Sequence, residues 1–268
     1  MPPRPNTEPH FATSDPRQPA LEDSPSPLRA ECWRSALTQY PTNLGDILAD
    51  IITHGALLGY TGPDVLILSN NLSSAHDAPE VLDNQLDEDL RLGRVCAATP
   101  TQPFISSPLG LVPKSDNTLR RIHHLSFPSG RSVNDNIPAG NATLRYTAVT
   151  DIFEAVRGAG RGAVLIKRDL KDAFRMTPVA PQHRWLLGFS WRGNHYTERC
   201  LPFGLRTAPF LFNLFAEGLH WTWLASAPPE WLVQLIHYLD DFIATSHQAV
   251  PRHPCYSSIS ISAGCSAS

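Results

Sequence analysis

The chain has 268 residues and a mass of 29.5 kDa, and 42% of its residues are hydrophobic, which excludes a wholly disordered, collagen-like or fibrous protein. The net charge is −3, with six basic and 14 acidic residues in 1–100 against 16 basic and 11 acidic residues in 101–268. The later part is therefore mildly basic, and its cations are mostly Arg, which suits phosphate contacts as well as an ordinary solvated surface.

Neither a targeting segment nor a membrane-spanning segment is predicted. The first residues lack the apolar region of a secretory signal, and no run of about 18 uncharged apolar residues occurs. The five cysteines form no CxxC pair and no zinc-like spacing. We therefore expect an intracellular protein with reduced thiols, in the cytoplasm or nucleus, that is neither secreted nor embedded in a membrane.

The first hundred residues are expected to form a tail followed by helices. Residues 1–30 contain eight prolines and few large apolar side chains, which predicts a disordered tail. Apolar residues recur at helical spacing over Asn43–Gly59, and typical helix-start and helix-end residues bracket Asp77–Gly93. Residues 31–103 are therefore predicted to be a helical N-terminal extension.

From Phe104 the pattern changes to short strands and hairpins that alternate with helices. The expected strands are Leu109–Pro113, Leu119–Leu125, Gly162–Arg168, Trp185–Trp191, His195–Arg199, Leu232–Leu239 and Phe242–Thr245, and the expected helices surround Val149–Val156 and cover Pro209–Trp223. This mixture predicts an α+β fold, with residues 104–247 as one domain. Residues 248–268 show no clear period and are predicted to be an unrelated, disordered tail.

Two acidic residues occur at the turn between the last two predicted strands, in Tyr238-Leu239-Asp240-Asp241. Asp tolerates turn geometry, so a plain hairpin turn explains the pair. The preceding strand is apolar, however, and two adjacent anions at the end of a buried strand repel each other unless a cation lies between them. Because hard oxygen ligands favour Mg²⁺ or Mn²⁺ over zinc, the pair is also a candidate metal site.

A third acidic residue, Asp169, follows the predicted strand Gly162–Arg168. Three Asp carboxylates can hold two metal ions about 4 Å apart, with substrate phosphates completing the coordination. One ion lowers the pKa of an attacking hydroxyl, and both stabilise the charge that develops during phosphoryl transfer. The three acidic residues together favour a phosphoryl-transfer site.

Five motifs occur in an order typical of one family of polymerases: Ser107–Lys114, Arg120–Ser126, Ile166–Phe174, Leu201–Leu205 and Tyr238–Asp241. In order and spacing they resemble reverse transcriptases (RNA-directed DNA polymerases), and their wording is most similar to retrotransposon polymerases of the tyrosine-recombinase-bearing (DIRS-like) type. The resemblance runs from about Leu37 to Thr245. It implies the fingers and palm of a right-hand polymerase, with an antiparallel sheet and helices packed on one face. It also implies that dNTPs are added to a primer 3′-OH on an RNA or DNA template.

The resemblance assigns the catalytic role to three residues. Asp169, Asp240 and Asp241 would hold two Mg²⁺ ions, with Mn²⁺ as an alternative, and the carbonyl of Leu170 would also face a metal ion.

It also implies which residues bind the incoming nucleotide. Lys114 and Arg120 would hold the triphosphate, with Arg121 as the alternative to Arg120 if the strand register slips; a solvated hairpin explains these cations as well. Asp172 and Ala173 would lie near the triphosphate, although Asp172 also suits a helix cap.

The remaining matched residues concern the sugar, the template and the primer. Phe174 would stack under the sugar and clash with a ribose 2′-OH, unless it only packs in the core. Phe203, where many relatives carry Gln, would contact the nucleotide beside the templating base pair. Pro202 and Gly204 would lie along the template, and Tyr238 would lie near the primer end.

The family pattern stops near Ser246. Reverse transcriptases normally continue with a thumb, and Pro251–Ser268 resembles none of it, so a C-terminally truncated chain without a thumb is predicted. Two functions are therefore open: an RNA-directed DNA polymerase domain, or an inactive retroelement remnant that serves as a nucleic-acid-binding module. Phe174 and the wording of Tyr238–Asp241 disfavour an RNA-directed RNA polymerase.

Overall fold

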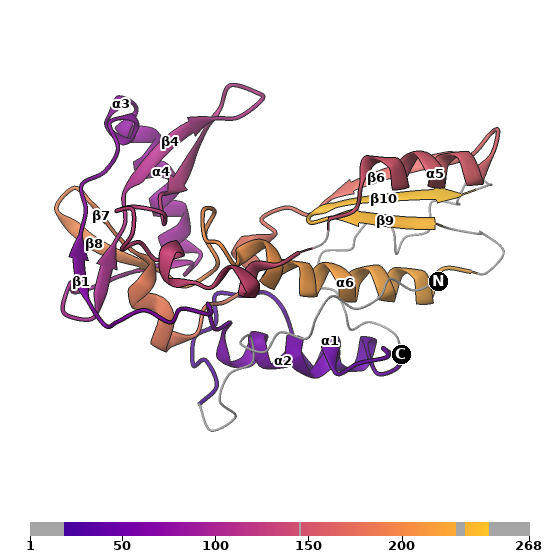
Figure 1. Cartoon of the computed structure of the whole chain (residues 1–268), viewed down its shortest axis with the longest axis horizontal. Helices are drawn as coiled ribbons and strands as arrows, with labels where there is room; N and C mark the ends of the chain where they lie inside the picture. Colours follow the sequence, from indigo (N-terminus) through magenta and orange to yellow (C-terminus); the bar gives the residue numbers. More distant parts are fainter. Residues whose placement is uncertain (1–18, 145, 229–233, 247–268) are drawn as a thin grey trace.

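The chain folds into two lobes that lie side by side (Figure 1), and the computed structural model describes residues 19–144, 146–228 and 234–246. One lobe, which we call the large-sheet lobe, is built on a five-stranded sheet; the other, the small-sheet lobe, is built on a three-stranded sheet. Helices accompany both sheets, and the small sheet is antiparallel throughout. The α+β class predicted from the sequence is therefore confirmed.

The large-sheet lobe combines strands from distant parts of the sequence. Its strands lie in the order β1 (Leu66–Leu68), β3 (Phe104–Ser106), β7 (Gly188–Trp191), β8 (Asn194–Glu198) and β2 (Val95–Ala97). The hairpin of β4 (Leu109–Pro113) and β5 (Leu119–His123) and the helices α3 (Ser74–Asp77) and α4 (Pro79–Arg91) complete this lobe. Apolar side chains of α4, Leu82 and Leu86, pack with Phe189 and Trp191 of β7.

The small-sheet lobe consists of a thin sheet with helices on both sides. The sheet order is β6 (Val164–Asp169), β10 (Asp241–Ser246) and β9 (Gln234–Tyr238), and its helices are α1 (Ala30–Ala36), α2 (Leu44–His54), α5 (Val149–Ala159) and α6 (Ala208–Ser226). Apolar side chains surround α6 on nearly all sides, which is typical of a buried helix. In Figure 1, α6 lies between the sheet and the pair α1 and α2. The ring of Trp223 contacts Phe242 of the sheet at 5.1 Å, and that of Trp33 in α1 contacts Phe215 at 5.4 Å.

The expectation that helices cover one face of this sheet is wrong for α5. His237 of β9 faces α6, because its ring contacts His220 of that helix. Gln234 and Tyr238 point to the opposite face, since side chains alternate along a strand. A Cβ at Gly158 of α5 would lie 3.5 Å from the Gln234 side chain, so α5 covers this second face, as Figure 1 shows.

The predicted helix Asn43–Gly59 ends earlier, at His54, and the reason is a close backbone approach. Gly55 has a φ of 88°, and a Cβ there would overlap the backbone of Ala180. The chain then forms a bridge between Ala56 and Val179. Only glycine fits this position, because it tolerates both the left-handed φ and the close approach.

Two predicted domain boundaries differ from the structure. Strands β1 and β2 belong to the predicted helical extension but pair with strands from 104–247. The predicted boundary between residues 103 and 104 therefore does not separate the two lobes. Three-residue strands are too short to show a period in the sequence. Residues 19–30 also pack onto the fold: Leu28 is buried, and Ser26 Oγ donates to the Met176 carbonyl at 2.6 Å. The rest of the predicted N-terminal tail, 1–18, and the whole of the predicted C-terminal tail, 248–268, lie outside the described residues.

None of the helices in the described part of the chain is both long and apolar enough to cross a lipid bilayer.

Acid should destabilise the protein partly through His123, whose ring is buried and contacts the carbonyl of Gly188 at 3.0 Å through Nε2. Burial lowers the pKa of His123 to about 4. In the unfolded chain His123 takes up a proton near pH 6.5, whereas in the folded protein it stays neutral down to about pH 4. The contribution of neutral, buried His123 to stability is therefore complete above pH 6.5 and is lost as the pH falls to about 4. Between pH 7 and pH 5 we expect His123 to account for a loss of roughly 2 kcal/mol in the free energy of unfolding, measured by urea denaturation.

The matched variants are His123→Gln and His124→Gln. The first should remove this part of the pH dependence, and the second, at the neighbouring and only partly buried position, should keep it. Equal pH dependence in both variants would contradict the assignment.

Candidate active site

The pairing of β6 with β10 places two of the three predicted catalytic carboxylates opposite each other. The Cα atom of Asp169 is the register partner of that of Asp241. The N–H of Leu170 donates to the carbonyl of Asp240 at 3.0 Å, which brings the third residue to the same end of the sheet. The structure therefore brings together residues that are far apart in the sequence.

A tight turn presents Asp240 at this place. Strand β9 ends at Tyr238, and β10 begins at Asp241, so only two residues connect the strands. Leu239 adopts the left-handed conformation with a φ of 54°, which is uncommon for a residue other than glycine. The local geometry is thus a hairpin turn, as one interpretation of the sequence predicts, and the three acidic residues gather around it.

A lysine pairs with one of the three carboxylates. Nζ of Lys167 lies 2.9 Å from Oδ1 of Asp241, and this pairing raises the pKa of Lys167, with smaller contributions from the charges of Asp169 and Asp240. As the side chains lie, the described residues contain no group of three or more His, Cys, Asp or Glu that could hold a metal ion.

The electrostatics of the three carboxylates nevertheless suit a cation. Partial burial raises the pKa of Asp240, and the negative charges of Asp169 and Asp241 raise it further. The available ligands are carboxylate and carbonyl oxygens, the donors that Mg²⁺ and Mn²⁺ prefer. The donor set fits a divalent metal, provided that the Asp241 carboxylate exchanges its contact with Lys167 for the ion.

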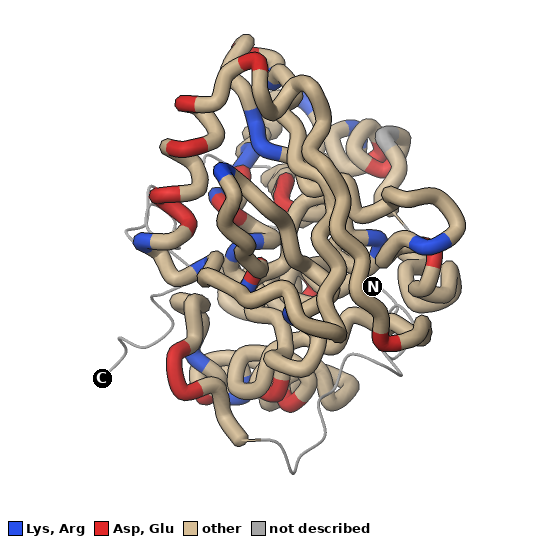
Figure 2. Tube along the Cα trace, turned by 90° about the vertical axis from the view of Figure 1, so that its left-hand side faces the viewer, with Lys and Arg blue, Asp and Glu red and all other residues tan. Residues whose placement is uncertain are grey.

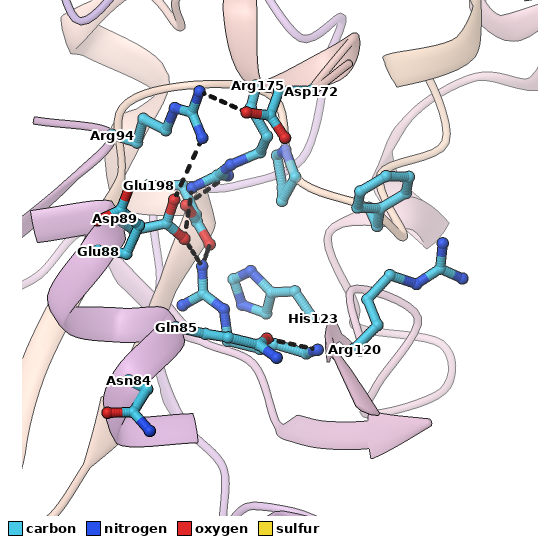
Figure 3. A pocket seen from close by; sticks show the side chains of 13 residues that line it. Asn84, Gln85, Glu88, Asp89, Arg94, Arg120, His123, Asp172, Arg175 and Glu198 are labelled. Atoms are coloured by element: carbon cyan, nitrogen blue, oxygen red, sulfur yellow. Dashed lines mark hydrogen bonds and ion pairs between the residues drawn. The ribbon is translucent and has the colours of Figure 1, made fainter. Parts of the chain in front are cut away.

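A pocket of about 310 Å³ lies between α4, the β4–β5 hairpin and the turn after β6. Five residues to which the sequence assigns a nucleotide or template role, or an alternative to one, line it: Arg120, Arg121, Asp172, Pro202 and Phe203. The guanidinium of Arg120 lies over the Phe203 ring, 4.7 Å from its centroid. Figure 3 shows Asp89, Arg94, Asp172, Arg175 and Glu198 converging on one side of this pocket, with Arg120 on the other side.

The structure separates the roles of the two neighbouring arginines of β5. Arg120 is exposed and contacts Phe203, whereas the Arg121 side chain is only 8% exposed and bonds Asp89 at 2.6 Å. Both arginines line the pocket, but the guanidinium of Arg121 is paired with Asp89 and Glu198, whereas that of Arg120 is the more accessible to a ligand.

Lys114 is not among the residues that line the pocket. It lies exposed in the turn between β4 and β5, and its N–H donates to the Thr118 carbonyl at 2.7 Å. The hairpin turn alone explains the position of Lys114. To bind phosphate, its side chain would have to reach a ligand that extends beyond the pocket wall.

Phe174 contacts other aromatic rings at the side of the pocket. Its ring centroid lies 5.2 Å from that of Phe203 and 5.5 Å from that of Phe212 in α6, in edge-to-face geometry. Its neighbours Ala173 and Leu170 are buried, whereas Phe174 is only partly buried. The ring therefore packs against the core and also keeps an accessible side.

The predicted template and primer residues lie on two different surfaces. Gly204 has a φ of 102°, and a Cβ there would overlap the carbonyl oxygen of His123, so the close backbone approach expected at this glycine is to the chain itself. Pro202 is buried beside it. Tyr238 is 49% exposed and stacks on Tyr146 with 5.0 Å between ring centroids, next to the Asp240 turn.

A buried charge cluster, which the sequence did not predict, forms the inner wall of the pocket; its members are Asp89, Arg121, Arg175 and Glu198. Glu198 is 1% exposed and bonds Arg175 at 2.7 Å and Arg121 at 3.1 Å. Burial alone would raise the pKa of Glu198, but the charges of Arg175 and Arg121 lower it overall. These residues come from α4, β5, the 3₁₀ turn Phe174–Met176 and β8, and no spacing in the sequence connects them.

Outside this cluster the charges of the large-sheet lobe are mixed. Figure 2 shows a row of Asp and Glu along one helix on this side of the molecule, which is α4, and Lys and Arg on neighbouring segments. The charge difference between the two parts of the sequence therefore does not produce a separate basic face here.

Comparisons with known proteins find similar sequences. The family model "Reverse transcriptase (RNA-dependent DNA polymerase)" matches residues 116–259, so the similarity extends beyond Ser246, where the family pattern was expected to stop. The chain is 30% identical over 128 residues to the Pro-Pol polyprotein of Simian foamy virus type 1, and 39% identical over 83 residues to the Pol polyprotein of Feline endogenous virus ECE1. These alignments cover 48% and 28% of the chain, and 10% and 8% of the relatives, so the chain spans about a tenth of their length.

A similar fold occurs in a solved structure. The crystal structure of Prototype Foamy Virus Protease-Reverse Transcriptase matches with a TM-score of 0.50 and 23% sequence identity, over 69% of this chain and 22% of that one. This likeness concerns the fold alone and is consistent with the predicted fingers and palm; in that prediction the large-sheet lobe corresponds to the fingers and the small-sheet lobe to the palm.

Proposed function

The chain belongs to the reverse transcriptase (RNA-dependent DNA polymerase) family, and we propose that it adds dNTPs to the 3′-OH of a primer paired with an RNA or DNA template. The observation that carries this proposal is the pairing of Asp169 with Asp241 beside Asp240. Three carboxylates at one end of a palm sheet are the group that this chemistry requires, because it must compensate the charge of a reacting triphosphate.

The proposed metal ligands are Asp169, Asp240, Asp241 and the carbonyl of Leu170. Two Mg²⁺ ions bound there would supply a lower pKa for the primer hydroxyl and stabilisation of the developing charge. The closeness of the three like charges supports this assignment, since an ion would offset their repulsion.

The proposed nucleotide site is the pocket between fingers and palm. Arg120 supplies an exposed guanidinium at the pocket, which can contact phosphate or stack on a base, and Lys114 supplies a second cation from the hairpin turn. Asp172 and Ala173 form the turn beside the nucleotide, and Phe203 lines the base side. Tyr238, Pro202 and Gly204 are assigned to primer and template.

Two finer assignments accompany the proposal. The motif wording favours a polymerase of a tyrosine-recombinase-bearing retrotransposon. An intracellular site of action is expected, because template, primer and dNTPs occur there.

The test is extension of a DNA primer by one nucleotide on an RNA template, with dNTP and Mg²⁺. We expect extension by the wild-type chain and none by Asp169→Asn. Equal signals from the two proteins would refute catalysis by this site. Salt-dependent binding of the primer–template without extension would instead support the nucleic-acid-binding module.

Ribonucleotide exclusion is a further prediction for Phe174. Because its ring keeps an accessible side next to Phe203, replacing it with valine removes the bulk that would meet a 2′-OH. We expect Phe174→Val to raise the ratio of rNTP to dNTP incorporation by about tenfold or more, which corresponds to a steric cost above 1 kcal/mol.

Phe212→Leu is the control for this prediction, since Phe212 contacts the same ring from the buried helix α6. This variant should lower stability without changing the ratio. If both variants change the ratio equally, Phe174 acts only through packing.

A further inference from the structure

A single arginine connects the wall of the pocket with the turn that follows β6. Nη2 of Arg94 donates to Oδ2 of Asp172 at 3.0 Å, and Nη1 lies 3.9 Å from Oδ1 of Asp89. Figure 3 shows this guanidinium between the two carboxylates. The Arg94 side chain is 17% exposed and that of Asp172 is 39% exposed, so the pair lies at the mouth of the pocket, partly shielded from water.

The backbone holds Arg94 in this position from both sides. Its N–H donates to the Asp89 carbonyl at 2.8 Å, and its carbonyl accepts from the N–H of Arg199 at 2.7 Å. The residue lies in the short connection between the end of α4 at Arg91 and the start of β2 at Val95. The guanidinium is therefore preorganised by the fingers, and pairing with Asp172 costs little additional order.

Asp172 is a residue that needs such a partner. It has a φ of 57°, in the left-handed region, between β6 and the 3₁₀ turn Phe174–Met176. Asp tolerates this conformation but does not favour it. An unpaired carboxylate here would also place a negative charge beside the site where the proposed function requires a triphosphate.

We propose that Arg94 is a positioning residue for the incoming nucleotide. By pairing with Asp172 it neutralises a carboxylate at the mouth of the pocket and holds the turn of Asp172 and Ala173 in place. This inference rests on the proposed function, because it presupposes that dNTP binds beside this turn. It adds a residue from the fingers, outside all five sequence motifs, to the nucleotide site.

The first measurement is nucleotide affinity of the full chain. Binding of a fluorescently labelled dATP with Mg²⁺ is titrated, and the dNTP dependence of single-nucleotide extension is measured in parallel. For Arg94→Gln we expect Kd and KM to rise about tenfold, because a charge-assisted pair is lost, while kcat stays within about twofold. Arg91→Gln is the matched control: it removes the same charge from the end of α4, where Arg91 pairs with exposed Glu88, and it should bind like wild type.

A double-mutant cycle with Asp172→Asn shows how Arg94 acts. If Arg94 works through Asp172, Arg94→Gln should have little effect once the carboxylate has been removed. An equal loss of affinity in the Asp172→Asn background would overturn the inference. The inference would also be overturned if the wild type binds labelled dATP and Arg94→Gln binds it with the same affinity. Failure of the wild type to bind labelled dATP would overturn the proposed function as well.

Arg94→Lys keeps the inference testable if Arg94→Gln melts at a lower temperature than Arg91→Gln. It retains the positive charge, so we expect affinity within about threefold of wild type. A tenfold loss in this variant, with its melting temperature unchanged, would contradict neutralisation of Asp172.

Discussion

Replacement of Asp240 by asparagine is expected to abolish primer extension and, at the same time, to raise the melting temperature of the metal-free protein. The loss of activity should be at least about 10³-fold, or roughly 4 kcal/mol of transition-state stabilisation, because a proposed metal ligand is removed. The gain in stability has a separate cause. Folding places the Asp240 charge near those of Asp169 and Asp241 and partly buries it, and both effects disfavour its ionised form.

Removal of Mg²⁺ provides the second half of this test. An ion that binds only the folded state stabilises it by mass action, so Mg²⁺ should raise the melting temperature of the wild type, and a chelator should reverse this effect. Asp240→Asn should show a smaller response to Mg²⁺.

The control for this prediction is Asp87→Asn, which makes the same change at an exposed position of α4. It should leave the melting temperature, the response to Mg²⁺ and extension unchanged. If Asp240→Asn melts below the wild type in the absence of metal, the three carboxylates do not repel one another as proposed.

Replacement of Glu198 by alanine is expected to cause the largest loss of stability, about 3–5 kcal/mol in the free energy of unfolding. Glu198 is the buried partner of both Arg121 and Arg175, whose side chains are 8% and 9% exposed. Without it, two buried guanidinium groups share Asp89 as their remaining carboxylate. Leaving a buried guanidinium without its carboxylate lowers the free energy of unfolding by more than the intact ion pair contributes to it.

Urea denaturation at neutral pH measures this loss. Glu88→Ala is the matched control, because Glu88 pairs with Arg91 on the surface, where both side chains are more than half exposed. That variant should lose less than about 1 kcal/mol. Similar losses in the two variants would show that the buried cluster contributes no more than a surface ion pair.

The sequence by itself determined the local elements and the order of the motifs. Turn residues separated the strands of the hairpins at Ser115–Thr118 and Gly193-Asn194, and the structure has both hairpins. An apolar run that ends in Asp169, and another that ends before Asp240, predicted acidic groups at strand ends. These predictions were correct because turn propensity and strand periodicity depend on neighbours in the chain.

Only the tertiary structure decided which of these groups meet. The register of β6 against β10 brings Asp169 to Asp241. Ion pairs of its guanidinium distinguish Arg121 from its neighbour Arg120. The charge cluster around Glu198, the pair of Arg94 with Asp172 and the position of α5 on the second face of the sheet had no counterpart in the sequence. Each of these features depends on contacts between segments that are far apart along the chain. A local pattern of residues does not show which distant segment will pack against it.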